Sequence, residues 1–382
     1  MSKNKEELKK IVIINGHYSL SKGGSEWQCH LLANSLMVNG FAVYYFALDV
    51  VSKHKLTEEY NIIGCADIPI YKIVSIMNSI GNTIVYWRYG RDALYSYKNI
   101  FNNRNNIYVY AASSEYDLKK FRVLPFGDNY LPKLLLKNVK KMCCNYINYS
   151  QLKKFDIVTI NNPVIYDINS NKNIRNFTYV PNIFEKRFFD DGEPTLTDSN
   201  QYVLWISNIK NIKKPLMFIE IAKRFLKINK NIIFKLAGEI QDDKLYRHIL
   251  KEMPSNAIYI GHIPQKDVLK LIKASIAVVS TSTSEGLPNV LLQSLCVGVP
   301  VCCLTNIKFP IYDRKFLYLC DNINDYINSL NIIISYRESE NYQNDKKQII
   351  EQVSSLHSSK SAMKSLLTVT SKVRQLKTLG DT

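Results

Sequence analysis

The segment Ser280–Val301, STSTSEGLPNVLLQSLCVGVPV, carries the clearest structural signal in the chain. It follows an apolar run that we predict to be a strand, it turns at Gly286, and it then shows a helical pattern with Pro288 in the first turn. Proline is favoured there because the N–H that it lacks would have no helical partner. The free N–H groups at the start of such a helix suit a diphosphate, so this βα unit predicts an anion site.

Outward from this segment, short β-rich runs alternate with helical patterns, which indicates βαβ units and parallel sheets. The predicted strands are Ile11–Asn15, Ala42–Phe46, Ile84–Trp87, Ile107–Tyr110, Asp156–Ile160, Phe177–Val180, Tyr202–Ile206, Ile232–Ala237, Ile258–Ile260, Ile276–Val279 and Val301–Leu304. The predicted helices span 25–38, 245–252, 265–273, 289–296, 323–334 and 346–356, and a further one starts at Pro215. The first of them is predicted to be capped by Ser25 and to carry Trp27, Leu31, Leu32 and Leu36 on one face. Two open α/β sheets in tandem bind ligands at the carboxyl ends of their strands.

The periodic signal stops at residues 190–200, which are polar and rich in turn formers. A chain of 382 residues exceeds what one hydrophobic core usually organises. We therefore predict an N-terminal domain at 1–189, a linker at 190–200, and a C-terminal domain at 201–382 that includes the last helices.

Composition excludes several classes of protein. Hydrophobic residues at 46% and charged residues at 22% are ordinary for a globular protein. The formal net charge of +17 could serve nucleic acid, an anionic membrane or a negatively charged ligand, or could reflect codon usage alone. Without a zinc-finger or RNP signature we expect no nucleic-acid partner. The 8 cysteines lack a C-x-x-C spacing, and we find no signal peptide or membrane span, so we expect reduced thiols and a cytoplasmic protein.

Glu285, Gly286, Pro288 and the helix after them resemble the signature of retaining glycosyltransferase family 4. The family's second Glu is replaced here by Gln293, as in a branch that reads Glu-Gly-x-Pro-Asn and then Gln. An amide can still hydrogen-bond a ribose hydroxyl. The resemblance implies an α/β protein of the GT-B fold, with two Rossmann-like domains whose parallel sheets face a central cleft. It also implies that the domain at 1–189 binds the acceptor and that the domain at 201–382 binds a nucleoside-diphosphate sugar. The sugar is then transferred to a hydroxyl, with retention.

Other segments extend the resemblance over most of residues 11–305. The strand and loop Tyr202–Lys213 resemble the family's basic pair, in which Asn208 takes the place of an Arg or Asn and Lys213 that of the Lys which neutralises the leaving diphosphate. The implied catalytic residues are Glu285 and Lys213, with Lys214 as the fallback for Lys213. The implied donor-binding residues are Gly23, Gly24, Asn208, Lys214, Gly286, Leu287, Pro288, Asn289 and Gln293.

The acceptor side is less defined. Segments ending in Arg88 and spanning 111–117 resemble strand ends of the same branch, but the His that many members have in the second segment is absent. Glu115 and Asp117 are the nearest polar candidates there. His17 lies near the glycine loop, where it either touches a ligand or is a hydrogen-bonded structural residue.

No Asp-x-Asp occurs, so we expect no metal and no cofactor besides the donor substrate. Lysine, backbone N–H groups and a helix end would supply the positive field. The expected product is a surface polysaccharide or glycoconjugate. The alternative is a catalytically silent protein that binds a nucleotide sugar or a glycan.

One further segment, 131–149, suggests a location. Lysines at 133, 137, 140 and 141 recur at helical spacing while leucines at 131, 134 and 135 and Met142 occupy another face. This pattern fits a helix that docks on the inner face of the plasma membrane, next to a lipid-linked saccharide acceptor. It fits equally a surface helix that packs its leucines on the first sheet.

Overall fold

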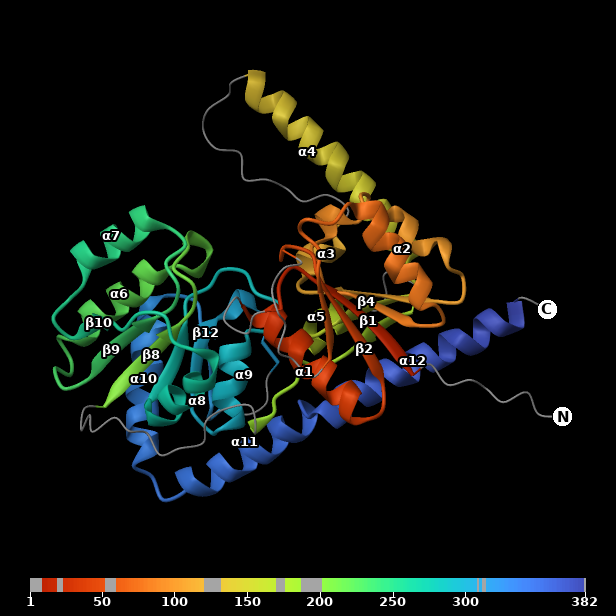
Figure 1. Ribbon diagram of the computed structural model, residues 1–382. Helices are drawn as coiled ribbons and strands as arrows, with labels where there is room; N and C mark the ends of the chain where they lie inside the picture. The colour runs from red at the N-terminus through yellow and green to blue at the C-terminus, as the bar shows by residue number, and fades with distance from the viewer. Residues whose placement is uncertain are drawn as a thin grey trace. The chain divides into compact units, whose positions relative to one another are not determined.

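The computed structural model describes residues 9–18, 23–51, 60–119, 132–169, 176–186, 201–307, 309–310 and 314–380. The chain divides into two compact units (Figure 1). Unit 1 comprises Met1–Ile183 and Ser359–Thr382, and unit 2 comprises Phe184–Ser358. Each unit is a parallel sheet with helices packed on it, so the predicted α/β class with two Rossmann-like domains is confirmed. The predicted linker at 190–200 lies outside the described residues.

The sheet of unit 1 has the order β3-β2-β1-β4-β5-β6-β7, and its strand pairs are parallel. Its strands are β1 (Lys10–Asn15), β2 (Ala42–Ala47), β3 (Asn61–Gly64), β4 (Ile84–Trp87), β5 (Ile107–Ala112), β6 (Ile157–Ile160) and β7 (Phe177–Tyr179). Its helices are α1 (Gly24–Val38), α2 (Ile70–Ile80), α3 (Glu115–Leu118), α4 (Pro132–Gln151), α5 (Pro163–Asn169) and α12 (Ser359–Gly380). Ile11–Ile14 are all 0% exposed, as expected for a central strand with both faces covered.

Helix α1 differs in two ways from the prediction. It begins at Gly24 with Gly23 as its N-cap and no side-chain cap, so Ser25 lies inside the helix. It is also buried around most of its circumference, because it packs against β1 and β2 on one side and against α12 on another. A helix covered on two sides needs apolar residues beyond a single stripe.

The last helix corrects the predicted domain boundary. We expected residues up to 382 to belong to the second domain, whereas α12 packs on α1, β5 and β7 and therefore belongs to unit 1. Leu366 at 0% and Val373 at 4% exposure form its buried face. Lys377 fixes its far end through Nζ, which lies 2.8 Å from a carboxylate oxygen of Asp156.

The sheet of unit 2 has the order β10-β9-β8-β11-β12-β13, again with parallel pairs. Its strands are β8 (Tyr202–Ile206), β9 (Ile233–Ala237), β10 (Ala257–Tyr259), β11 (Ala277–Ser280), β12 (Val301–Leu304) and β13 (Leu317–Cys320). Its helices are α6 (Pro215–Phe225), α7 (Asp243–Glu252), α8 (Gln265–Ala274), α9 (Asn289–Cys296), α10 (Ile323–Arg337) and α11 (Tyr342–Leu356). Pro288 immediately precedes α9 as its N-cap and is not in its first turn.

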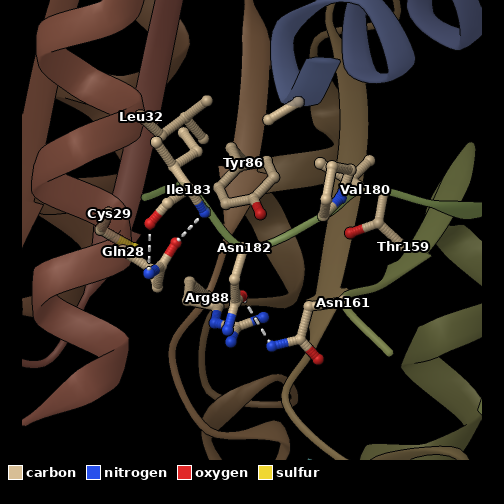
Figure 2. A pocket seen from close by; sticks show the side chains of 12 residues that line it. Gln28, Cys29, Leu32, Tyr86, Arg88, Thr159, Asn161, Val180, Asn182 and Ile183 are labelled. Carbon is tan, nitrogen blue, oxygen red and sulfur yellow. Dashed lines mark hydrogen bonds between the residues drawn. The ribbon is translucent and has the colours of Figure 1, made fainter. Parts of the chain in front are cut away.

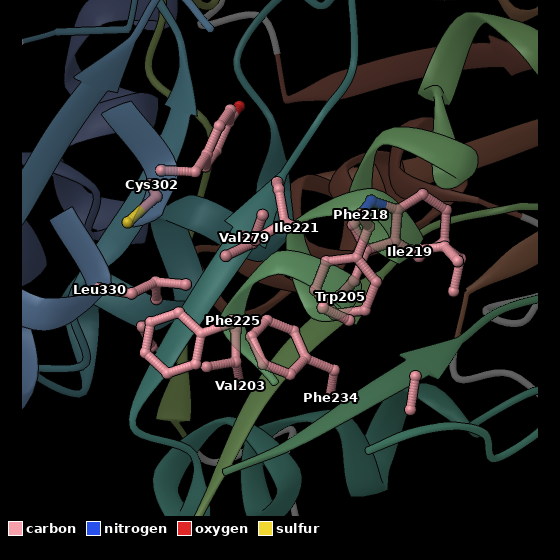
Figure 3. Close-up of a cluster of buried hydrophobic side chains, with 14 of the residues drawn as sticks. Val203, Trp205, Phe218, Ile219, Ile221, Phe225, Phe234, Val279, Cys302 and Leu330 are labelled. Atoms are coloured by element: carbon pink, nitrogen blue, oxygen red, sulfur yellow. The ribbon is translucent and has the colours of Figure 1, made fainter. Parts of the chain in front are cut away.

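Aromatic side chains fill the core of unit 2 around β8 (Figure 3). The Phe234 ring lies 5.5 Å from that of Phe218 and 5.6 Å from that of Phe225, both on α6. Trp205 on β8 is 1% exposed and its ring lies 6.4 Å from Phe218. Each such buried side chain contributes about 1.5–3 kcal/mol, so the strand that leads into the predicted basic loop is firmly held.

Candidate functional site

The strand order of unit 2 reverses direction between β8 and β11. The chain runs outward from β8 through β9 to β10 on one side and from β11 through β12 to β13 on the other. In open α/β sheets, ligands bind outside the carboxyl ends of the strands at such a switch point. Lys213 follows β8, Glu285 follows β11, and their side chains form an ion pair at 16% and 20% exposure. The structure thus brings together the two residues predicted to be catalytic, and their roles remain a prediction.

Thr281, which directly follows β11, ties the two loops together. Its hydroxyl oxygen lies 2.8 Å from the carbonyl oxygen of Lys213 and 2.9 Å from that of Lys214, and it accepts a hydrogen bond from Trp205 Nε1 at 3.0 Å. Thr283 adds a backbone N–H that donates to the Ile212 carbonyl at 3.0 Å. The basic loop is therefore anchored through its backbone, which leaves the Lys213 side chain for the ion pair. Sequence reasoning missed Thr281.

Lys210 is a second cation of this loop that sequence reasoning missed. It is the N-cap of the short 3₁₀ turn Asn211–Lys213. Burial lowers the pKa of Lys210, the nearby charge of Lys213 lowers it further, and Glu285 partly opposes both. Two lysines and one carboxylate therefore share the switch point, an arrangement that favours an additional anion.

The residues after Glu285 form the turn into α9. Leu287 and Pro288 are buried, and α9 begins at Asn289. Gln293 lies inside the helix at 4% exposure. The N-terminus of α9 thus follows within a few residues of the carboxylate that pairs with Lys213.

Two backbone positions shape the other side of the basic loop. A Cβ atom on Gly238, at the end of β9, would lie 1.8 Å from the Ser207 carbonyl oxygen, so no side chain fits there. Asn208 follows at intermediate exposure. Lys214 is exposed and has a left-handed φ of 48°, from which Pro215 starts α6. Lys214 therefore directs the chain into α6, whereas Lys213 is the residue that pairs with Glu285.

The sheet of unit 1 has a corresponding switch point, between β1 and β4, and a cavity of about 260 Å³ lies there. Its lining comes from loops after four different strands and from the start of α1. The lining residues are Asn15, Gly16, Ser25, Glu26, Asp49, Arg88, Tyr89, Gly90, Tyr110, Ala111, Ser113 and Asp117. Arg88 and Asp117 were predicted as acceptor-side residues, and both line this cavity.

Charged groups dominate this cavity. Burial raises the pKa of Glu26, the nearby Arg88 guanidinium partly offsets the rise, and Asp49 adds to it. Tyr89 donates its hydroxyl to Asp49 Oδ1 at 2.9 Å. Asp117 accepts hydrogen bonds from the Ser113 N–H at 2.8 Å and hydroxyl at 2.6 Å. Glu26 and Asp49 are site residues that the sequence did not reveal, because they come from different segments.

Arg88 also borders a second, smaller cavity of about 20 Å³ (Figure 2). Figure 2 shows Arg88 beside Asn161 and Asn182, where Asn161 Nδ2 donates to Asn182 Oδ1 at 2.8 Å. Gln28 closes one side through hydrogen bonds to the backbone of Ile183, at 3.0 Å to its carbonyl and 2.6 Å from its N–H. A space of this size is about that of one water molecule.

The remaining predicted residues lie outside the lining of both cavities. Gly23 caps α1 and Gly24 begins it. The His17 carbonyl accepts a hydrogen bond from the Tyr45 hydroxyl at 2.8 Å, and the His17 ring stacks on Tyr18. Glu115 begins the short helix α3.

Within the described residues, no group of three or more His, Cys, Asp or Glu side chains could hold a metal ion. In the same part of the chain, every helix is too short or too polar to span a bilayer.

A family of known proteins matches part of unit 2. Residues 187–311 match the family model described as glycosyl transferases group 1. This segment contains Lys213, Glu285 and the loops that join them. Glycosyltransferase 1 domain-containing protein 1 of Xenopus tropicalis is 29% identical over 102 residues, which are 26% of this chain and 29% of that protein. The chain thus spans less than a third of that curated relative.

Solved structures extend the likeness to both units. TarM of S. aureus is similar with a TM-score of 0.71 at 12% identity, over 95% of this chain and 99% of that one. Anabaena Alr3699/HepE, solved in complex with UDP and glucose, has a TM-score of 0.63 at 14% identity, over 98% of this chain and 100% of that one. At these identities the likeness shows the fold, which is that of GT-B glycosyltransferases.

Proposed function

We propose that this protein is a retaining hexosyltransferase of the family 4 type that uses a nucleoside-diphosphate sugar. The observation that carries the proposal is the Lys213–Glu285 ion pair at the switch point of unit 2. Both residues lie within the segment that matches group 1 glycosyltransferases. The structure of the similar HepE protein with UDP and glucose supports a donor of this chemical class.

In this proposal Lys213 neutralises the charge that develops on the leaving diphosphate, and Lys210 adds a second positive charge nearby. The N-terminus of α9 offers backbone N–H groups to the same anion. Glu285 accepts hydrogen bonds from hydroxyl groups of the donor sugar, and Gln293 binds the ribose. The leaving phosphate accepts the proton of the acceptor hydroxyl, which gives retention without a protein base.

The acceptor is a glycan or a lipid-linked saccharide, and the product belongs to a surface polysaccharide or glycoconjugate. The cavity of unit 1 supports this assignment, because it lies at the second switch point and is rich in groups that bind hydroxyls. The proposed location is the cytoplasm, with reversible docking on the inner face of the plasma membrane.

A turnover assay tests the proposal. The donor is found first by thermal shift against a panel of nucleotide sugars, since a ligand that binds the folded state raises its apparent stability. Release of nucleoside diphosphate is then followed for Lys213→Ala and Glu285→Ala. Each variant should lose roughly a hundredfold or more in rate, as expected for groups that act on developing charge.

The chain offers a matched control in the same unit. Lys223 and Glu252 form another ion pair, with Nζ and Oε2 2.5 Å apart, at 37% and 40% exposure. Lys223→Ala and Glu252→Ala should leave turnover unchanged. Turnover like the wild type in either site variant would remove that residue from the site. Nucleotide-sugar binding without transfer or hydrolysis would instead favour a catalytically silent binding protein.

A further inference from the structure

The cavity of unit 1 is acidic although the chain as a whole is basic. Among the described residues, three carboxylates, those of Glu26, Asp49 and Asp117, line it together with one guanidinium, that of Arg88. The formal net charge of the chain is +17, so the acidic lining of this cavity differs in sign from the charge of the chain as a whole. Its volume of about 260 Å³ is slightly below the roughly 300–1,000 Å³ typical of small-molecule sites.

The Arg88 guanidinium is bound to the protein through one of its nitrogens. Arg88 Nη1 already donates to the Ala112 carbonyl at 3.0 Å and lies 3.4 Å from the Ala111 carbonyl. Its Nε is buried without a partner in the described residues, next to the smaller cavity. Part of the guanidinium is therefore engaged with the protein.

The backbone is adapted to admit one of the carboxylates. A Cβ atom on Gly16 would lie 2.6 Å from Asp49 Oδ2 and 3.1 Å from the Tyr89 ring. Glycine at this position thus lets the Asp49 carboxylate approach the end of β1. The Tyr89 hydroxyl holds Asp49 Oδ1, which fixes the direction of this carboxylate.

We propose that this cavity binds an uncharged, hydroxyl-bearing terminal sugar of the acceptor and discriminates against an anionic one. Ionised carboxylates only accept hydrogen bonds, so they require donors such as sugar hydroxyls. A uronate or a phosphate in the same place would meet two or more like charges, which is strongly unfavourable in a partly buried site. This proposal rests on the proposed function, because it assigns the charge class of the acceptor that the enzyme would use.

Binding of three disaccharides tests the proposal. They share one reducing sugar and differ in the terminal one, which is a hexose, a 2-amino-2-deoxyhexose or a hexuronic acid. Dissociation constants are measured by NMR titration for the wild type, for Asp49→Asn, for the Glu26→Gln/Asp49→Asn double variant, and for Asp167→Asn, an exposed carboxylate on α5.

The wild type and the Asp167 control should bind the hexose disaccharide at least about tenfold more tightly than the uronate, a difference of ~1.4 kcal/mol. The double variant should reduce this ratio to below about threefold, with its folded state verified by circular dichroism. Equal or tighter uronate binding by the wild type, an unchanged ratio in the double variant, or binding of none of the three sugars would overturn the proposal. Nucleotide-sugar turnover is measured on the same preparations, so failure of the proposed function would be seen separately.

Discussion

Lys213 and Lys214 are adjacent in sequence but differ in environment. The Lys213 side chain is 16% exposed and paired with Glu285, whereas Lys214 is exposed and serves the turn into α6. Both carbonyls are held by Thr281, so loss of either side chain should leave the loop in place. The two residues therefore form a matched pair for testing which ammonium group contacts the donor.

Lys213→Ala should weaken binding of the nucleoside diphosphate by roughly tenfold or more, because a charge-assisted hydrogen bond contributes about 1.5–3 kcal/mol. Binding of the corresponding monophosphate should change little. Lys214→Ala should leave both affinities close to those of the wild type. Calorimetric titration measures this, and an equal loss for both nucleotides would show that Lys213 supports the base or the fold instead of the second phosphate.

The ionised form of Glu26 lowers the stability of the folded state, because the side chain is largely buried. Burial raises its folded-state pKa above that in the unfolded chain, with Arg88 and Asp49 as the facing charges. A raised carboxyl pKa means that the folded state is favoured with the group protonated, and this stability is lost as pH rises through the folded pKa. Glu26→Gln should therefore raise the melting temperature at pH 7–8, because it removes the charged form that burial disfavours. The difference should vanish near pH 4, and a gain that persists there would contradict the assignment.

At the scale of elements, α12 shows how a terminal helix completes a distant sheet. Its buried residues include Ala362 and Leu366 at 0% exposure, and Arg374 near its end contacts Asn82 through Nη2 and Oδ1 at 3.2 Å. The packing of α12 on α1 explains why α1 is buried on two sides. Unit 1 should therefore depend on residues that follow unit 2 in the chain.

Leu366→Ala should lower the stability of unit 1 by roughly 2–5 kcal/mol, the usual cost of removing a buried leucine side chain. Of the 3 tryptophans, Trp27 and Trp87 lie in unit 1 and Trp205 in unit 2. Urea unfolding followed by fluorescence in a Trp205→Phe background therefore reports on unit 1. Leu376→Ala, at a site 55% exposed, is the control and should have little effect.

Helix α4 carries the predicted membrane-docking segment. The helix is confirmed at Pro132–Gln151, but the side chains of residues 132–141, which include the four lysines, lie outside the described residues. On the described part of α4, Met142, Tyr146 and Ile147 are exposed by 47%, 48% and 40%. Exposed apolar residues next to a basic segment support the docking prediction.

Sedimentation with liposomes tests it. Lysines near an anionic surface contribute about 1 kcal/mol each, so changing residues 133, 137, 140 and 141 from Lys to Gln should abolish most binding to anionic vesicles. The matched control changes four exposed lysines of unit 2 at positions 227, 230, 244 and 251 to Gln, which preserves the total charge change. Docking by α4 is wrong if the wild type prefers no lipid charge or if both quadruple variants bind alike.

Most elements could be predicted from the sequence because their signals are local. Strands β4, β8 and β12 have the predicted bounds, since each is a compact apolar run between turn residues. The edge strands β3 and β13 were missed, because their burial patterns are mixed, whereas β4 is buried throughout. The assignment of α12 to unit 1 was also missed, because only tertiary packing determines it.

The two candidate sites also differ in how far the sequence could predict them. The Lys213 loop and the turn at Glu285 could be located from motifs within single segments, whereas their ion pair required the strand order. The acidic cavity could not be predicted, because Glu26 and Asp49 come from a helix start and a strand end that only the fold brings together.

At the scale of the whole molecule, the chemistry is expected to be independent of metal. Two lysines, Lys210 and Lys213, lie at the switch point of unit 2, where their charges can act on the leaving diphosphate in place of a metal ion. Addition of EDTA should therefore change turnover by less than about twofold. The check is a titration of EDTA followed by readdition of Mg²⁺, and a complete loss that magnesium restores would contradict the proposed mechanism.

The position of α12 has a consequence for synthesis. Residues 184–358 are contiguous, so unit 2 has all of its chain as soon as Ser358 leaves the ribosome. Synthesis of unit 1 begins first, but this unit lacks α12, which covers α1, until residues 359–380 are made. Although domains usually fold in the order of their synthesis, here the second unit can be finished before the first. During that interval the uncovered side of α1 is an apolar surface on the nascent chain, open to chaperones and to misassembly.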